Sequence, residues 1–190
     1  VHHGNGTQAV FYEESQVLFC SLHQWPLYPG SGWITECGAG EGEGFTVNLP
    51  MPVGSRDGDY MLALERVVLP IVEQFRPQAL LVSAGFDPHS DEHLASLQMS
   101  EDGFAAMALR LLRLARRACD GRLAPALEGG YGRMTGYLTG GYDRTPVNRS
   151  VAAVLEALAL EKAPDVGPAG EKAGAAIERA GEVQSRYWTL

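Results

Sequence analysis

Apolar and polar positions follow two different periods along this chain. Two segments carry apolar residues close to every 3.6 positions, as amphipathic helices do: residues 57–75 and 100–118. Four short apolar runs are typical of buried strands: residues 17–22, 45–49, 79–84 and 123–127. Further helical segments are expected at residues 9–12, 151–160 and 175–188. Strands that alternate with helices in this way predict an α/β fold with a parallel sheet.

The flanking residues refine these boundaries. Asp57 or Asp59 is expected to cap the first long helix, and Ser100 the second. Pro50–Pro52 is expected to end the strand at residues 45–49. The run 79–84 is continuously apolar, a pattern typical of strands covered on both faces. We expect one domain over residues 1–190, with a carboxyl-terminal helical extension over residues 161–190 that begins in a stretch rich in Ala, Gly and Glu.

Composition narrows the classes of function. The chain has 190 residues, is 45% apolar and carries a net charge of −8, which argues against a nucleic-acid-binding surface because phosphate binding needs clustered Lys and Arg. No apolar run approaches the roughly 20 residues that a membrane span needs. Cys20, Cys37 and Cys119 are widely spaced and odd in number, so we expect no disulfide framework and a cytoplasmic location.

Polar chemistry follows the strands at three places, Ser21–His23, Gly85–Asp87 and Gly129–Tyr131. Ligands of parallel sheets bind at the carboxyl ends of strands, so these segments are expected to line one pocket. The chain also begins with His2-His3-Gly4, which suits a metal-site loop. A catalytic zinc ion needs about three N or O ligands and an open position, of which His2 and Asp87 can supply two. From the residues alone, a single Asp after a strand, such as Asp87, is more often a helix cap or a turn former. Tyr131 could likewise simply pack at a strand end.

Four sequence blocks resemble signatures of the histone deacetylase superfamily, especially its class II-like and bacterial members. They occur in family order: residues 2–8 (HHGNGTQ), 28–32 (YPGSG), 83–87 (SAGFD) and 127–131 (LEGGY). The segment 91–104 extends the match. The resemblance implies the arginase-deacetylase fold, a three-layer α/β/α sandwich with a mainly parallel sheet, here incomplete at its amino-terminal side.

The resemblance also implies an activity and a cofactor. Family members hydrolyse an acetyl amide, on a protein lysine or on a small amine such as an acetylpolyamine, with one zinc or sometimes iron ion. Its ligands are an Asp, a His two residues later and a distant Asp. The His corresponds to His2 and the distant Asp to Asp87, while the first Asp would stand just before Val1.

Further roles follow from the resemblance, residue by residue. Tyr131 matches the tyrosine that donates to the tetrahedral oxyanion, a role suited to a phenol aimed at developing charge. Ser21 and Leu22 match residues that bind a structural potassium ion. Tyr28, Leu94 and Gly130 match residues of the substrate tunnel. His3 matches a residue that forms hydrogen bonds beneath the metal. Tyr28 could also be a core aromatic residue.

The family also uses an upstream pair of histidines as general base and acid, and this sequence has no such block. We therefore expect the chain to be a deacetylase fragment that is inactive or weakly active alone, and that self-associates through an incomplete sheet edge. The alternative is a non-catalytic binding or scaffold module, or one half of a split deacetylase. An arginase-like dimanganese enzyme is disfavoured because Gly4-Asn5-Gly6 supplies no further carboxylates.

Overall fold

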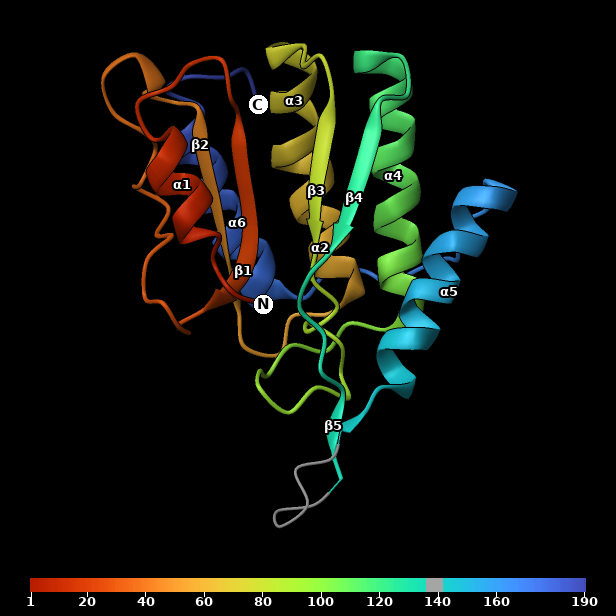
Figure 1. Cartoon of the computed structure of the whole chain (residues 1–190). Helices are drawn as coiled ribbons and strands as arrows, with labels where there is room; N and C mark the ends of the chain where they lie inside the picture. Colours follow the sequence, from red (N-terminus) through yellow and green to blue (C-terminus); the bar gives the residue numbers. More distant parts are fainter. Residues whose placement is uncertain (136–141) are drawn as a thin grey trace.

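Two pairs of parallel strands form the centre of the computed structural model, which describes residues 1–135 and 142–190 (Figure 1). The first pair is β1 (Phe19–Trp25) and β2 (Thr46–Pro52), and the second is β3 (Leu80–Ala84) and β4 (Leu123–Leu127). Within the described residues the pairs form separate sheets. Their carboxyl ends point to the same edge, at the bottom of Figure 1. The predicted parallel α/β architecture is confirmed.

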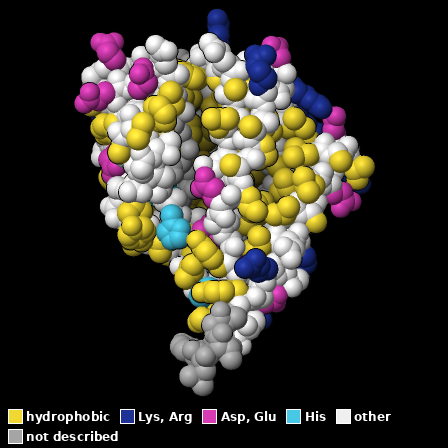
Figure 2. Space-filling model, viewed as in Figure 1, with side chains coloured by type: hydrophobic (Ala, Val, Ile, Leu, Met, Phe, Trp, Pro, Cys, Tyr) yellow, Lys and Arg dark blue, Asp and Glu magenta, His cyan; other side chains and the backbone are white. Residues whose placement is uncertain are grey.

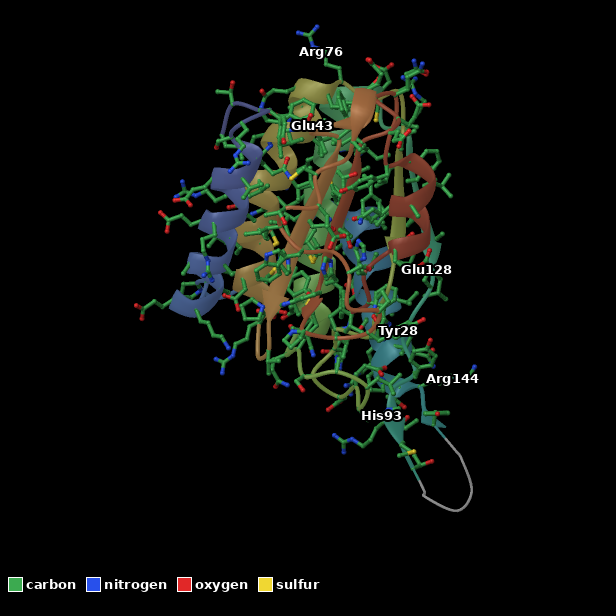
Figure 3. All side chains as sticks on the ribbon, turned by 90° about the vertical axis from the view of Figure 1, so that its left-hand side faces the viewer. Tyr28, Glu43, Arg76, His93, Glu128 and Arg144 are labelled. Atoms are coloured by element: carbon green, nitrogen blue, oxygen red, sulfur yellow. The ribbon has the colours of Figure 1, made fainter. Side chains whose placement is uncertain are left out.

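Helices lie on both sides of the strands. The α-helices are α1 (Asn5–Phe11), α2 (Asp57–Ala63), α3 (Leu69–Phe75), α4 (Glu101–Cys119), α5 (Thr145–Leu160) and α6 (Glu171–Gln184). Helix α1 lies on one face of the first pair and α6 on the opposite face, as the two perpendicular views show (Figures 1 and 3). Short elements complete the fold: a 3₁₀ turn at Gly40–Gly42 and the antiparallel strands β5 (Arg133–Met134) and β6 (Tyr142–Asp143). No helix in the described ranges is long and apolar enough to cross a membrane.

The first predicted long helix is helical throughout but has a wide turn. A π-helical turn, Leu64–Val68, separates α2 from α3. It ends two residues before Pro70, which has no N–H to donate to an earlier carbonyl, so a change in the hydrogen-bond pattern is expected here. At the start of α2, Asp59 accepts a hydrogen bond from the backbone of Arg56 at 2.7 Å. Asp57 instead accepts from the N–H and hydroxyl of Ser100, at 2.8 and 2.6 Å, and so ties α2 to the start of α4.

The prediction that prolines end the second strand is wrong. β2 continues through Pro50 and Pro52, which stand opposite His23 and Trp25 of β1. In the described residues β2 is paired on one side only. A proline is tolerated in such an edge strand when the missing N–H faces away from the partner. The predicted first strand is likewise displaced, because its pairing extends to Trp25 rather than stopping at Leu22.

The prediction that residues 79–84 form a strand covered on both faces is also wrong for the described chain. Leu81 on β3 is 83% exposed and Leu127 at the end of β4 is 66% exposed. In Figure 2, apolar side chains gather on this side of the molecule. The helices that pack against β3 and β4 lie behind them in Figure 1, and no described helix covers the front. The apolar run thus has one half-buried face and one exposed face.

The two carboxyl-terminal helices pack in different places, α5 against α4 and α6 against β2. Helix α5 begins at Thr145, earlier than predicted, because Pro146 lies in the first turn, where a missing N–H costs no hydrogen bond. Helix α6 contacts β2 and buries Ile177. Beyond its end, Trp188 donates from Nε1 to the carbonyl of Gly44 at 2.8 Å. The last residues therefore close over the loop that precedes β2.

We expect Leu114→Ala to lower the free energy of unfolding by about 2–5 kcal/mol, because Leu114 on α4 is fully buried and truncation leaves a cavity. Leu155→Ala on α5 is the matched control, since that leucine is 62% exposed. It should change stability by less than about 0.5 kcal/mol. Urea denaturation of both variants measures the difference, and equal effects would show that the core is assigned wrongly.

Candidate active site

The carboxylate of Asp87 lies at the carboxyl edge of the strands, where the amino terminus meets β3. Asp87 is 3% exposed, and its Oδ1 accepts a hydrogen bond from the Val1 ammonium at 2.6 Å. Its Oδ2 is 3.5 Å from Nδ1 of His2, whose side chain is 39% exposed. The backbone of β1 completes the junction, since Gln24 donates its N–H to the carbonyl of Val1 at 2.9 Å. The two sequence-predicted metal ligands are therefore neighbours.

Glycine lets the end of β4 approach this carboxylate. A Cβ atom placed on Gly129 would overlap the carboxylate of Asp87, and one on Gly85 would come within 2.9 Å of its Oδ1. The backbone also closes here, because Phe86 donates its N–H to the carbonyl of Gly129 at 2.7 Å. A side chain at Gly129 would therefore clash with Asp87, a requirement for glycine that the sequence alone does not reveal.

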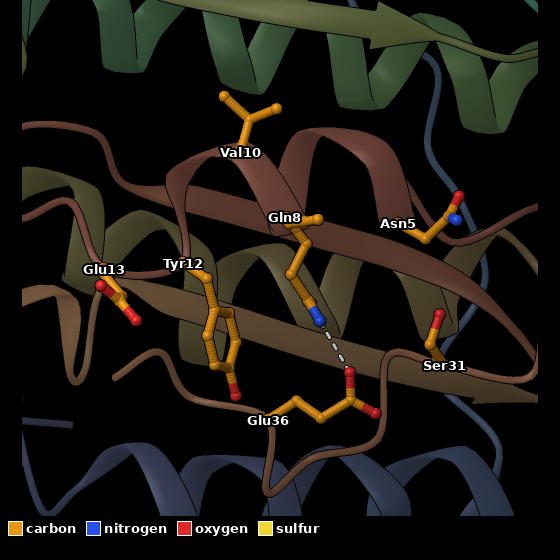
Figure 4. A pocket seen from close by; sticks show the side chains of 8 residues that line it. Asn5, Gln8, Val10, Tyr12, Glu13, Ser31 and Glu36 are labelled. Carbon is orange, nitrogen blue, oxygen red and sulfur yellow. Dashed lines mark hydrogen bonds between the residues drawn. The ribbon is translucent and has the colours of Figure 1, made fainter. Parts of the chain in front are cut away.

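His3 belongs to a buried polar network beneath the site. Its Nδ1 is 2.9 Å from the Ser31 hydroxyl, and its Nε2 is 2.9 Å from Oε1 of Gln8. Gln8 donates to Glu36 at 2.6 Å (Figure 4). Burial alone would raise the pKa of Glu36, but hydrogen bonds from Trp33, Gln8 and Gly32 outweigh it and hold the pKa below its usual value. The network ties the amino-terminal loop to the loop at residues 31–36, beside an open cavity of about 590 Å³.

Ser21 and His23 form a second buried group on β1. The Ser21 hydroxyl is 3.0 Å from Nδ1 of His23, and Nε2 of His23 donates to the carbonyl of Gly32 at 3.0 Å. Burial, reinforced by nearby His3, lowers the pKa of His23 to about 4. Since its Nε2–H donates to a carbonyl, the neutral ring accepts the Ser21 hydroxyl proton at Nδ1. Leu22, between them, is half-buried.

Tyr131 follows the glycine pair at the end of β4, and its side chain is 45% exposed. Gly130 has a φ of +134°, a conformation that only glycine adopts readily. Two residues predicted to line the substrate tunnel are also exposed, Tyr28 by 77% and Leu94 by 44%. The Tyr28 ring meets the His2 ring edge-on, with centroids 6.3 Å apart, on the side shown in Figure 3. Tyr28 is therefore a surface residue beside His2, and its alternative assignment to the core is wrong.

The described residues supply two ligands for a metal. His2 and Asp87 offer the imidazole nitrogen and carboxylate oxygen that zinc accepts. Residues 1–135 and 142–190 contain no group of three or more His, Cys, Asp or Glu side chains suited to hold a metal ion. One Asp87 oxygen is moreover engaged by the Val1 ammonium. These residues fit part of a zinc site and not a complete one.

A family model described as histone deacetylase domain matches residues 1–137. The chain belongs to the histone deacetylase family. It is 48% identical over 130 residues to a probable deacetylase of Archaeoglobus fulgidus, covering 68% of this chain and 36% of that protein. It is 43% identical over 132 residues to a histone deacetylase-like amidohydrolase of Pseudomonas aeruginosa, covering 69% of this chain and 35% of that protein. The chain thus spans about a third of these relatives.

Solved structures of the family share the fold. The structure of the histone deacetylase Clr3 has a TM-score of 0.85 and 34% identity over 99% of this chain, and 30% of that chain is covered. The HDA15 HD domain has a TM-score of 0.82 and 32% identity, also over 99% of this chain, with 49% of that chain covered. The arginase-deacetylase fold expected from the sequence blocks is confirmed, and it extends through the carboxyl-terminal helices.

The sequence analysis did not identify two carboxylates, Glu36 and Glu92, that hold backbone segments around the candidate site. Glu36 accepts hydrogen bonds from the backbone of Gly32 and Trp33, and Glu92 accepts from the backbone of Tyr131. Both lie in loops whose patterns do not reveal burial. The glycines in both donor segments were the available signal, because backbone N–H groups beside glycines are accessible to a side chain.

His23 should make stability depend on pH. In the unfolded chain a histidine has a pKa near 6.5, so it takes up a proton below that pH, whereas the folded chain resists protonation down to about pH 4. Stability is therefore lost as the pH falls from about 6.5 to 4, by about 3 kcal/mol in total. Urea denaturation across this range should show a flatter pH profile for His23→Gln. Identical pH profiles would contradict the assignment.

Proposed function

We propose that this chain is the carboxyl-terminal part of a metal-dependent deacetylase that hydrolyses acetyl amides, on protein lysine or on a small amine. The observation that carries the proposal is the meeting of His2 and Asp87 at the strand edge, with Gly129, two residues before Tyr131, directly against Asp87. The deacetylase relatives support the reaction class. The acetyl-amide substrate is proposed for the whole protein, of which this chain is a part.

The proposed metal is zinc, with iron as the alternative for the same mixed ligands. His2 and Asp87 would hold it together with one further carboxylate from the position before Val1. When bound, the ion would polarise the acetyl carbonyl and activate a water molecule. In a chain that continues upstream, the Val1 nitrogen would be an uncharged amide, so Asp87 would lose its competing cation and be freer to bind metal.

The remaining residues would orient the substrate and stabilise charge. The Tyr131 phenol would donate to the oxyanion, and Gly130 would let its side chain reach the carbonyl. Tyr28, Gly130 and Leu94 would line the substrate tunnel. His3, held by Ser31 and Gln8, would support the loop that carries His2. Ser21 and Leu22 would hold a structural potassium ion. We also propose a cytoplasmic location, on the grounds of cysteine usage.

Low activity of the 190-residue chain follows from its ligands. One Asp87 oxygen is paired with the Val1 ammonium, and the sequence lacks the histidine pair that serves as general base and acid in the family. Loss of general acid–base catalysis costs about 10²–10⁴-fold in rate. Two metal ligands in place of three weaken metal binding as well.

The test compares this chain with one extended through the sequence encoded upstream of Val1. We expect the extended protein to bind one zinc ion per chain and to deacetylate an acetyl-lysine peptide or an acetylpolyamine, and the short chain to do neither. Asp87→Asn should abolish both properties in the extended protein, whereas Asp102→Asn, at an exposed position on α4, should leave them unchanged. Metal analysis and product quantification provide the readouts.

Two results would contradict the proposal. Stoichiometric zinc with full turnover in the short chain would refute the missing-ligand account. A zinc-loaded extended protein that turns over neither substrate would favour the non-catalytic binding module. The ratio of the two turnover rates would assign the substrate class.

We further propose that the isolated chain self-associates through its uncovered strands. Leu81 and Leu127 expose apolar side chains beside strand edges that pair with nothing among the described residues. Sedimentation velocity should show association that increases with concentration and that Leu81→Lys with Leu127→Lys reduces. Val53→Lys, at a 48% exposed position after β2, is the matched control. A monomer at all concentrations would contradict this proposal.

A further inference from the structure

The loop that follows Asp87 holds the backbone around Tyr131. Glu92 lies in this loop, five residues after Asp87, and is 8% exposed. Its Oε1 accepts hydrogen bonds from the N–H of Tyr131, at 2.7 Å, and from the N–H of Gly132. Hydrogen bonds to an ionised carboxylate are shorter and stronger than those between neutral groups. Glu92 is thus a buried acceptor for two successive N–H groups of the tyrosine segment.

The neighbours of Glu92 reinforce the same contact. Nδ1 of His93 donates to the carbonyl of Gly132 at 2.9 Å, so both the N–H and the carbonyl of Gly132 are engaged. Asp91 accepts a hydrogen bond from Arg133 at 2.9 Å. Three consecutive residues, 91–93, therefore bind three consecutive residues, 131–133. We call this set of contacts the 91–93 clamp.

The segment around Tyr131 needs such a tether. Gly130 and Gly132 flank the tyrosine with φ values of +134° and +77°, and glycine loses more conformational freedom on folding than any other residue. The Tyr131 side chain is 45% exposed, so packing alone restrains it weakly. The hydrogen bonds to Glu92 fix the backbone on both sides of the tyrosine Cα. They do so from the same loop that begins at Asp87.

We propose that Glu92 is a positioning residue that sets where the Tyr131 phenol stands relative to the Asp87 carboxylate. The inference rests on the proposed role of Tyr131 as the oxyanion donor. A displacement of about 1 Å in such a group can cost about a hundredfold in rate. Glu92 acts through Tyr131 and does not itself touch the substrate.

The experiment uses the zinc-loaded protein extended upstream of Val1. Glu92→Ala should lower kcat by about tenfold to a hundredfold with little change in KM, because it loosens the oxyanion donor and leaves the tunnel intact. Glu92→Gln keeps an oxygen acceptor and should stay within about threefold of the parent. Glu92→Asp keeps the charge but shortens the reach, so it should resemble Glu92→Ala. Glu156→Ala, an exposed carboxylate on α5, is the control and should leave kcat unchanged.

A double-mutant cycle separates positioning from general destabilisation. In a Tyr131→Phe background, Glu92→Ala should have no further effect on kcat, because the group it positions is gone. A full additional loss in that background would overturn the inference. An unchanged kcat for Tyr131→Phe alone would instead refute the proposed role of Tyr131, so the two failures are distinguishable.

A measurement on the 190-residue chain needs no catalysis. Hydrogen exchange at the amides of Tyr131 and Gly132 should be faster in Glu92→Ala and Glu92→Asp than in the parent, with Glu92→Gln close to the parent. Melting temperatures identify any variant that is globally unfolded, and Glu92→Asp serves where Glu92→Ala does not fold. Unchanged exchange at both amides in a folded Glu92→Ala or Glu92→Asp chain would overturn the clamp.

Discussion

The buried carboxylate of Asp87 is the group on which the rest of the site depends. A buried charge is costly unless it is hydrogen-bonded, and here the Val1 nitrogen, at 2.6 Å, and the His2 ring, at 3.5 Å, lie beside the carboxylate. Gly85 and Gly129 leave room for the carboxylate between β3 and β4. The amino-terminal residues and the ends of β3 and β4 therefore meet at Asp87. The proposed roles of His2 and Tyr131 both depend on their positions relative to this carboxylate.

Two sets of hydrogen bonds flank Asp87, one on the β1 side and one on the β4 side. On the β1 side, His3, Gln8 and Glu36 form a buried network that ties the amino-terminal loop to the loop at residues 31–36. On the β4 side, Glu92 binds an exposed glycine-rich segment. The first holds the proposed ligand loop rigidly, while the second restrains a segment whose glycines would otherwise leave it free. This division suits the proposed function, in which the metal ligands are held in place and the Tyr131 phenol is oriented toward the substrate.

The sequence predicted the elements well where the signal is local. The 3.6-residue period located α2 to α4, and Ser100 caps α4 as expected by accepting from the N–H of Gly103. The strand ends also predicted that Gly85–Asp87 and Gly129–Tyr131 share one edge, whereas Ser21–His23 lies inside β1 and not at its end. Predictions failed where a residue's environment depends on distant segments. Pro50 and Pro52 remain in β2 because its outer edge is unpaired, and Leu81 is exposed because no described helix covers that face of β3.

By itself the sequence determined the fold class, the family and the identity of the candidate residues, because periodicity and short motifs are properties of neighbouring positions. Only the tertiary structure decided that the segment at Val1 and His2 meets Asp87, that His23 is buried with a lowered pKa, and that Glu92 holds the backbone of Tyr131. Each of these features depends on contacts between segments that share no sequence pattern. Their strength comes from burial, which exists only once the chain has folded.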